Sequence, residues 1–177
     1  KAKYVITTKE LIDNKTLSEF RIKCLVLKYS DETKKLNAKS TYQVEMDFLV
    51  SHEKRNAFIK NLTLTRKGNT LVLFQYVKKH GEPLYNQILK EAEEGRKVFF
   101  VYGGVDADTR EEVRAITEKE NDAIIIASYG TFSTGINIRN LHNVIFASPS
   151  KSRIRNLQSI GRGLRKGDNK ETATLYD

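Results

Sequence analysis

The stretch TLVLFQYVKKHGEPLYNQILKEAEEGRKVFFVYGG, from Thr70 to Gly104, decides the fold. Residues 70–76 and 97–102 are nearly continuous in Val, Leu, Phe and Tyr, which is typical of parallel strands covered by helices on both faces. Between them, Pro83 suits the first turn of a helix, and apolar residues recur at helical spacing until Gly95 ends it. The stretch therefore predicts a β-α-β unit.

The same alternation continues toward the C-terminus. Apolar runs at 122–127, 143–147 and 172–177 predict three more strands. Asp108 and Glu111 resemble the capping box of a helix between two of them. The succession predicts an α/β domain with a doubly wound, mostly parallel sheet flanked by helices.

The first 65 residues have a less regular pattern. Residues 21–29 predict a further strand, and residues 42–64 predict one or two helices leading into the sheet. The polar stretch 30–40 predicts an exposed loop. The chain starts without a methionine and stops directly after a predicted strand, so we expect it to be a piece of a longer protein.

Composition indicates one basic domain. The chain has 177 residues, 39% of them hydrophobic, which is enough for one core. It carries 31 Lys and Arg against 22 Asp and Glu, a net charge of +9, which suits a polyanionic partner such as nucleic acid. A basic surface without such a partner explains the charge equally well. Cys24 is the only cysteine, which excludes an intrachain disulfide and a cysteine-rich zinc site and favours a cytoplasmic setting.

Other kinds of site are not indicated. The apolar runs are far shorter than the roughly 20 residues that cross a bilayer, so no membrane partner is expected. The three histidines have no repeated ligand spacing, so no metal site is predicted. The tyrosines at the strand ends are candidates for stacking on bases, with core packing as the default: Tyr76, Tyr102 and Tyr129.

The segment from Lys151 to Lys170 holds seven basic residues and one acid, Asp168. At helical spacing, one side carries the apolar residues and glycine, which we expect to anchor the helix on the sheet: Ile154, Leu157, Ile160, Gly161 and Leu164. A neighbouring stripe carries Gln158, Arg162 and Arg165. An arginine fork binds phosphate oxygens and keeps its charge, as stabilisation of a phosphoryl-transfer transition state requires. A solvated basic helix is the alternative.

The order Q-x-x-G-R-x-x-R in this segment resembles the last conserved motif of superfamily 2 helicases. Three earlier stretches occur in the order expected of the second RecA-like domain of that family, with matching strands and turns: 70–80, 98–114 and 123–137. The resemblance extends over about 70–165. Within the family, the amino-acid sequence of residues 127–167 is most similar to that of a recombination helicase.

The resemblance implies roles residue by residue. Positions that match nucleotide-binding motifs are Gly135, Asn137, Gln158, Arg162 and Arg165. Arg165 matches the arginine finger, with Arg162 as the second catalytic arginine. Positions that match contacts to the nucleic-acid backbone are Lys78, Lys79, His80, Gly103, Arg110, Ser128 and Thr131. For Arg110, bracing of its own helix is the alternative. Asn137 stands where many members have Asp, which leaves its role open.

The resemblance implies a composite nucleotide site. ATP and Mg²⁺ would be held mainly by a preceding RecA-like domain, because this chain contains neither G-x-x-x-x-G-K-[ST] nor an acidic strand end. The stretch GTFSTGIN imitates the glycine spacing, but Ile136 and Asn137 replace the required residues. We therefore expect no hydrolysis by this chain alone. Residues 1–20 are predicted to be an arm or linker from the preceding domain, and residues 21–177 the second RecA-like domain.

The function that the resemblance implies is the C-terminal motor of an ATP-dependent DNA helicase in recombination and replication repair. Its partners would be branched or single-stranded DNA and the preceding domain of the same protein. Two alternatives stay open from the sequence. One is a nucleic-acid-binding module that kept the fold without the motor, and the other is an RNA helicase of the same superfamily.

Overall fold

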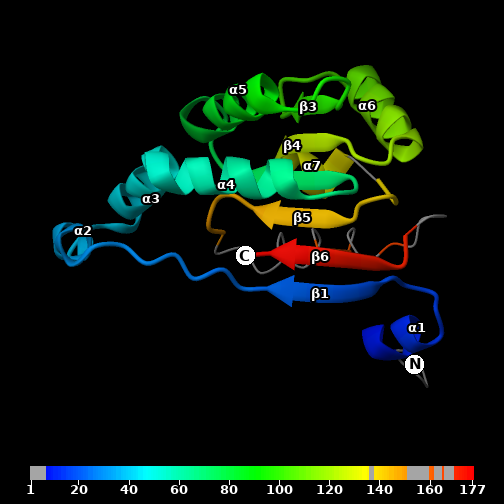
Figure 1. Cartoon of the computed structure of the whole chain (residues 1–177), viewed down its shortest axis with the longest axis horizontal. Helices are drawn as coiled ribbons and strands as arrows, with labels where there is room; N and C mark the ends of the chain where they lie inside the picture. The colour runs from blue at the N-terminus through cyan, green and yellow to red at the C-terminus, as the bar shows by residue number, and fades with distance from the viewer. Residues whose placement is uncertain (1–6, 136–137, 151–159, 162–164, 166–169) are drawn as a thin grey trace.

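The computed structural model describes residues 7–135, 138–150, 160–161, 165 and 170–177. Within these residues, six parallel strands form one sheet in the order β1-β6-β5-β2-β4-β3 (Figure 1). The strands are β1 (Glu19–Lys23), β2 (Thr70–Phe74), β3 (Val98–Val101), β4 (Ile124–Ser128), β5 (Asn143–Phe146) and β6 (Thr172–Tyr176). All five strands predicted from residue 70 onward are confirmed.

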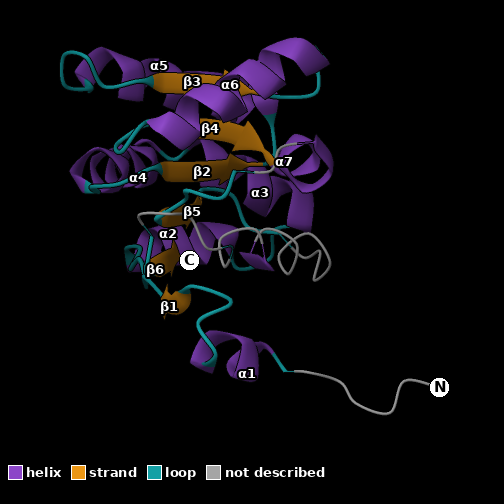
Figure 2. Ribbon diagram, turned by 90° about the vertical axis from the view of Figure 1, so that its right-hand side faces the viewer, coloured by secondary structure: helices purple, strands orange, loops and turns teal. Residues whose placement is uncertain are grey.

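Helices cover both faces of the sheet, as Figure 2 shows. In chain order they are α1 (Thr8–Asp13), α2 (Asp31–Asn37), α3 (Tyr42–Ser51), α4 (Glu53–Thr65), α5 (Glu82–Glu91), α6 (Ala107–Lys119) and α7 (Tyr129–Gly135). A single π-helical turn, η1 (Val77–Gly81), joins β2 to α5. The doubly wound fold class is therefore confirmed.

The core has two layers because side chains alternate along each strand. On β2, Leu71 and Leu73 pack in the cluster that includes residues of α6 and α7. Val72 and Phe74 pack in the other cluster, with residues of α4 and α5. All four side chains have no exposed surface. This two-sided burial explains why the strand sequences are continuous in apolar residues rather than alternating.

Two predicted helix boundaries differ from the structure. Pro83 does lie in the first turn of α5, but the helix ends at Glu91, ahead of the left-handed Gly95. The predicted capping box at Asp108 and Glu111 is wrong. The cap of α6 is Asp106, whose carboxylate accepts a hydrogen bond from the Thr109 N–H at 2.8 Å.

The N-terminal third differs more from the prediction. The predicted strand at 21–29 is β1, which ends at Lys23. The predicted loop at 30–40 contains α2, which has no buried residue and leaves Leu36 84% exposed. The predicted helices at 42–64 are α3 and α4, separated by His52. In Figure 1, α2 and α3 lie on the side toward which the strands point.

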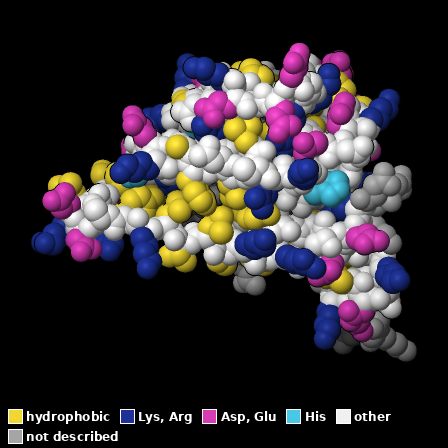
Figure 3. All heavy atoms as spheres, in the orientation of Figure 1, with side chains coloured by type: hydrophobic (Ala, Val, Ile, Leu, Met, Phe, Trp, Pro, Cys, Tyr) yellow, Lys and Arg dark blue, Asp and Glu magenta, His cyan; other side chains and the backbone are white. Residues whose placement is uncertain are grey.

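Hydrophobic side chains gather on the face shown in Figure 3. The chain after β1 and helix α4 line a shallow groove there, with Leu27 and Phe58 among its residues. Leu27 is 37% exposed and Phe58 is 38% exposed. The extended chain therefore covers this side of α4 only in part.

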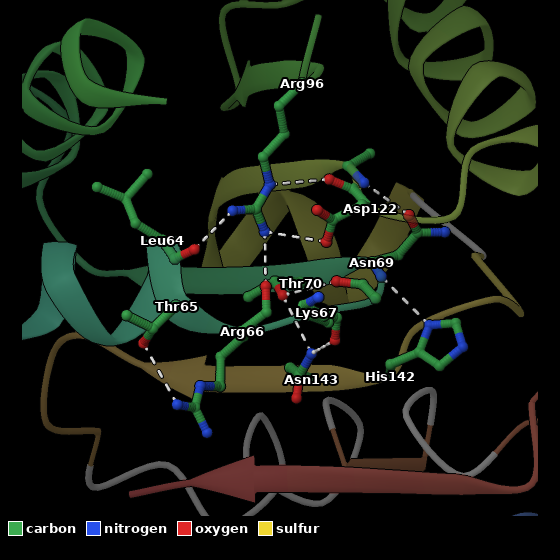
Figure 4. Close-up of polar contacts among 12 residues, drawn as sticks. Leu64, Thr65, Arg66, Lys67, Asn69, Thr70, Arg96, Asp122, His142 and Asn143 are labelled. Atoms are coloured by element: carbon green, nitrogen blue, oxygen red, sulfur yellow. Dashed lines mark hydrogen bonds and ion pairs between the residues drawn. The ribbon is translucent and has the colours of Figure 1, made fainter. Parts of the chain in front are cut away.

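The amino edge of the sheet is closed by a polar network (Figure 4). The Arg96 guanidinium donates to the carbonyls of Leu64 at 2.8 Å, Arg66 at 2.8 Å and Asp122 at 3.0 Å, and to the Asp122 carboxylate at 3.1 Å. The Asn69 side chain accepts from the Ala123 N–H at 2.8 Å. These bonds tie the starts of three strands together, so this part of the edge is occupied by the protein's own groups.

Candidate nucleic-acid and nucleotide interface

The carboxyl ends of β2 and β4 lie side by side and lead into two of the predicted nucleic-acid-binding segments. Phe74 pairs with Ser128 at the ends of these strands. Beyond β2, η1 presents Lys78 and Lys79 to solvent. The Lys79 ammonium lies 2.9 Å from the Asp47 carboxylate of α3, and this hydrogen bond lowers the pKa of Asp47. Exposed pairs of this kind contribute little stability, so both lysines remain available to a phosphate backbone.

Ser128 and Thr131 are engaged with each other. The Ser128 hydroxyl donates to the Thr131 hydroxyl at 2.8 Å and accepts from the Thr131 N–H at 3.3 Å. Ser128 therefore ends β4 and caps α7. Thr131 is only 6% exposed, so its side chain offers little surface. A nucleic acid reaching this turn would meet the half-buried Ser128 first.

His80 lies inside the protein, unlike the lysines that precede it. It has no exposed surface. Its Nδ1 lies 2.8 Å from the Ser148 hydroxyl, and its Nε2 lies 3.1 Å from Oδ1 of Asn56. The His80 side chain therefore does not have the access that the predicted backbone contact requires. It supports the turn that carries Lys78 and Lys79.

The hydrogen-bond partners assign the tautomer of His80. The Asn56 amide donates to the Val50 carbonyl at 2.8 Å, which leaves the Asn56 oxygen to accept from Nε2–H. Nδ1 is then the acceptor for the Ser148 hydroxyl, which itself accepts from the Gln75 N–H at 3.1 Å. Burial, together with the nearby Arg55 cation, lowers the pKa of His80 to about 4. The imidazole is neutral at physiological pH.

The same cluster holds the end of β5. The Tyr129 hydroxyl donates to the Ser148 carbonyl at 2.9 Å. The Arg55 guanidinium donates to the Ala147 carbonyl at 2.7 Å. Tyr129 is 1% exposed, and burial raises its pKa. Its alternative role in base stacking therefore does not fit, whereas its default role in core packing does.

Arg55, Asn56 and Ser148 were not among the residues predicted from the sequence. Each bonds to a group far away along the chain, so no local pattern marks it. The signal for Ser148 was its position directly after a buried strand, where a polar residue meets the ends of neighbouring strands. Arg55 and Asn56 stand one after the other on α4 and gave no comparable signal.

Gly103 and Arg110 flank the same edge near β3. Gly103 is exposed in the turn after β3, and a side chain added there would meet no atom within 4 Å. Arg110 is half-buried, and its Nε donates to the Asp106 carbonyl at 3.2 Å. Arg110 thus braces the start of α6, which was the alternative to nucleic-acid contact.

Arg165 lies away from this edge. It forms an antiparallel bridge with Leu17, just before β1, and Lys170 bonds to its carbonyl just before β6. Among the other predicted nucleotide-binding residues, Gly135 is the last residue of α7. Asn137, Gln158 and Arg162 lie outside the described residues.

Of the residues predicted to anchor the arginine segment, Ile160 is partly buried and packs against the core. Gly161 is exposed. Ile154, Leu157 and Leu164 lie outside the described residues. Among the described residues, Arg165 thus lies apart from the predicted nucleic-acid-binding residues, whereas Gly135 ends the helix that begins beside Ser128.

Among the residues that the structure describes, no three or more His, Cys, Asp or Glu side chains gather where they could hold a metal ion. No helix in this part of the chain is long and apolar enough to span a membrane.

Comparison with known proteins identifies a family and a relative that is similar over nearly the whole chain. The model of the helicase conserved C-terminal domain matches residues 53–167. The ATP-dependent DNA helicase uvsW of Enterobacteria phage T4 is 40% identical over 176 residues, which are 97% of this chain and 34% of that protein. The crystal structure of T4 UvsW superimposes with a TM-score of 0.75 at 39% identity, over 92% of this chain and 33% of that one. This chain therefore spans about a third of that relative.

More distant structures share the fold. The ATP-dependent Type ISP restriction-modification enzyme LlaBIII bound to DNA matches with a TM-score of 0.62 at 18% identity, over 94% of this chain and 12% of that one. The Escherichia coli DEAD-box protein SrmB matches with a TM-score of 0.55 at 21% identity, over 70% of each chain. Together with the T4 structure, these likenesses confirm the predicted RecA-like fold.

Proposed function

This chain belongs to the family of helicase conserved C-terminal domains, and we propose on that premise that it is the second RecA-like motor domain of an ATP-dependent DNA helicase. The observation that carries the proposal is 40% identity over 97% of the chain to a protein named as such an enzyme. Its substrates would be branched or single-stranded DNA in recombination and replication repair, and its location the cytoplasm of the phage host.

The nucleotide site is proposed to be composite. A first RecA-like domain would hold ATP and Mg²⁺, and this chain would supply Arg165 as the arginine finger, with Arg162. Gly135, Asn137 and Gln158 would complete its contribution. Arg165 is exposed in the structure, as a residue that reaches a neighbouring domain must be. A finger of this kind accelerates phosphoryl transfer about 10³- to 10⁵-fold. This chain alone would be inactive.

The nucleic acid is proposed to run along the carboxyl edge of the sheet. Lys78 and Lys79 supply exposed positive charges beyond β2, and Gly103 permits close approach of a backbone beyond β3. Ser128, with Thr131 behind it, supplies a hydroxyl between them. His80 would act indirectly, by holding the lysine turn in place.

The test of the nucleotide role is Arg165→Ala in the protein that joins this domain to its first RecA-like domain. DNA-stimulated ATP hydrolysis should fall at least about 10³-fold, while the dissociation constant for DNA stays within about twofold, because the finger contacts phosphate of the nucleotide only. Arg21→Ala on β1 is the control, since it removes another exposed arginine, whose guanidinium pairs with Glu19 and is not among the proposed site residues. Wild-type turnover in Arg165→Ala would sink the assignment.

The test of the substrate is the ATPase rate of the same protein with branched DNA, single-stranded DNA and RNA in parallel. The proposal expects the strongest stimulation with branched DNA. Equal or stronger stimulation by RNA would favour the RNA-helicase alternative. Binding of nucleic acid without any ATP hydrolysis would favour the binding module.

A further inference from the structure

Lys170 is buried, although the basic run that contains it suggests a solvated charge. It is 1% exposed. Its ammonium donates to the Arg165 carbonyl at 2.8 Å and reaches the Arg139 carbonyl at 3.4 Å. Burial lowers its pKa to about 8. The lysine thus joins two chain segments. One contains the proposed finger Arg165, and the other contains Arg139, which follows the proposed nucleotide-binding residues Gly135 and Asn137 in sequence.

A second set of contacts holds the main chain of Arg165, and one of them is to the same carbonyl. Leu17 forms an antiparallel bridge with it. The Ser18 hydroxyl lies 3.4 Å from the Arg165 carbonyl, and Ser18 is 2% exposed. The next residue, Glu19, donates its N–H to the Glu171 carbonyl at 2.8 Å. Residues 17–19 therefore bond both to Arg165 and to Glu171.

Burying an ammonium group costs free energy, so a buried lysine calls for a structural or functional explanation. Removing it from water costs several kcal/mol unless hydrogen bonds replace the water. An apolar side chain of similar length would fill the same space without that cost. What the ammonium adds is direction, because its N–H groups aim at carbonyls of two separate segments and fix their spacing.

We propose that Lys170, with Ser18, is a positioning residue that fixes the main chain of Arg165 relative to Arg139 and to residues 17–19. The proposal rests on the proposed function, since it assigns a support to the proposed finger. An arginine finger must be placed to within about 1 Å, and a displacement of that size costs about 100-fold in rate. The predicted linker 1–20 includes residues 17–19, so movement of the first domain would reach the finger directly.

The decisive variant is Lys170→Met in the protein that contains both RecA-like domains. Methionine is unbranched and only one atom shorter than lysine, so the variant keeps most of the side chain and removes the ammonium. The kcat of DNA-stimulated ATP hydrolysis should fall about 10- to 100-fold, with KM for ATP and affinity for DNA within about twofold of wild type. A merely structural role would lower the thermal midpoint without this selective loss of kcat.

The matched control is Arg96→Met. Arg96 is also a buried cation, with a side chain 5% exposed, and it also holds backbone carbonyls at the amino edge of the sheet. It lies by β3 and β4, away from Arg165. At a temperature where both variants are folded, Arg96→Met should keep the wild-type kcat. An equal loss of kcat in the two variants would overturn the proposal.

If Lys170→Met does not fold, a pair of milder variants tests the same proposal. Ser18→Ala removes only the hydroxyl beside the Arg165 carbonyl and should lower kcat about threefold. Thr63→Val is its control, because Thr63 also has a buried hydroxyl bonded to a carbonyl, that of Ile59. Parity of Ser18→Ala and Thr63→Val would also overturn the proposal. Turnover retained in Arg165→Ala would instead overturn the proposed function itself.

Discussion

His80 has a neutral imidazole whose two nitrogens are both used inside the protein. Protonation would turn Nδ1 from an acceptor into a donor, so the Ser148 hydroxyl would have to give up the bond it donates there. It would also place a second positive charge near Arg55 in a buried site. The folded state therefore resists a proton that the unfolded chain takes up readily.

This residue predicts a loss of stability in mild acid. The pKa of His80 is about 4 in the folded protein against an ordinary value of 6.5. Between these values the unfolded chain binds the proton and the folded chain does not, so the free energy of unfolding falls as pH drops from 6.5 toward 4. The loss from this group reaches about 3 kcal/mol. Urea unfolding at pH 7 and pH 4.5 measures it.

His80→Gln provides the comparison, because glutamine does not titrate. The variant should be less stable at pH 7 but should lose less stability than wild type on going to pH 4.5. Carboxylates contribute equally to both proteins, so the difference isolates His80. Identical pH dependence in the two proteins would show that the imidazole is not the group responsible.

At the scale of single residues, sequence patterns indicated candidate positions but could not show which of their side chains are exposed. Lys78, Lys79 and His80 are consecutive and belong to one segment that resembles a helicase motif, yet of the three only the lysines are exposed. The difference arises because Asn56 and Ser148 come from distant parts of the chain to meet the imidazole. No local pattern contains that information.

The start of helix α6 is determined by its N-cap residue. Two aspartates stand two residues apart, and either suits a cap by composition. Asp106 has extended backbone, with φ −65° and ψ 168°, whereas Asp108 already lies inside the helix. Hydrogen bonds from Thr109 lower the pKa of Asp106, so its carboxylate stays charged where the helix N-terminus favours an anion.

The cap predicts a difference between two otherwise similar substitutions. Asp106→Ala should lower the free energy of unfolding by about 1 kcal/mol, because it leaves the Thr109 N–H without its acceptor. Asp108→Ala should cost less than about 0.5 kcal/mol. Thermal or urea unfolding of the two variants side by side measures the difference. Equal losses would show that the cap is shared between the two carboxylates.

At the scale of elements, buried strands were the most predictable part. A strand covered on both faces must be apolar throughout, as β2 and β4 are, and the sequence shows that directly. Helix α2 was missed because it buries no residue, so its sequence carries no apolar stripe. Its start depends instead on a cap, with the Ser30 hydroxyl accepting from the Thr33 N–H at 3.3 Å.

For the whole molecule, the two edges of the sheet differ in availability. Arg96 and Asn69 occupy the amino edge near β3, β4 and β2 with internal bonds. At the carboxyl edge, Lys78, Lys79 and Gly103 face solvent. The resemblance to helicases located these segments in sequence, and the parallel sheet brings them to one edge. Their contact with DNA stays a prediction.

If DNA runs along the carboxyl edge of the sheet, as proposed, removing its lysines should change the salt dependence of DNA binding. Replacing Lys78 and Lys79 together by alanine should weaken the binding of single-stranded DNA. It should also reduce the slope of the logarithm of affinity against the logarithm of salt concentration by about 1.4, because each phosphate contact contributes about 0.7. Titrations between low and moderate salt measure the slope. Lys90 and Lys97, exposed outside the carboxyl edge, provide the control pair. An unchanged slope in the first pair would remove η1 from the interface.

The pairing of β1 with β6 has a consequence for synthesis. The register joins Glu19 to Thr172, so among the described strands the one that is made first pairs with the one that is made last. Until then, β1 has no strand on the side that β6 will occupy, and the rest of the sheet has to assemble without it. Contacts so distant along the chain form slowly. A nascent chain that stops before β6 therefore leaves β1 without its only strand neighbour in the described sheet.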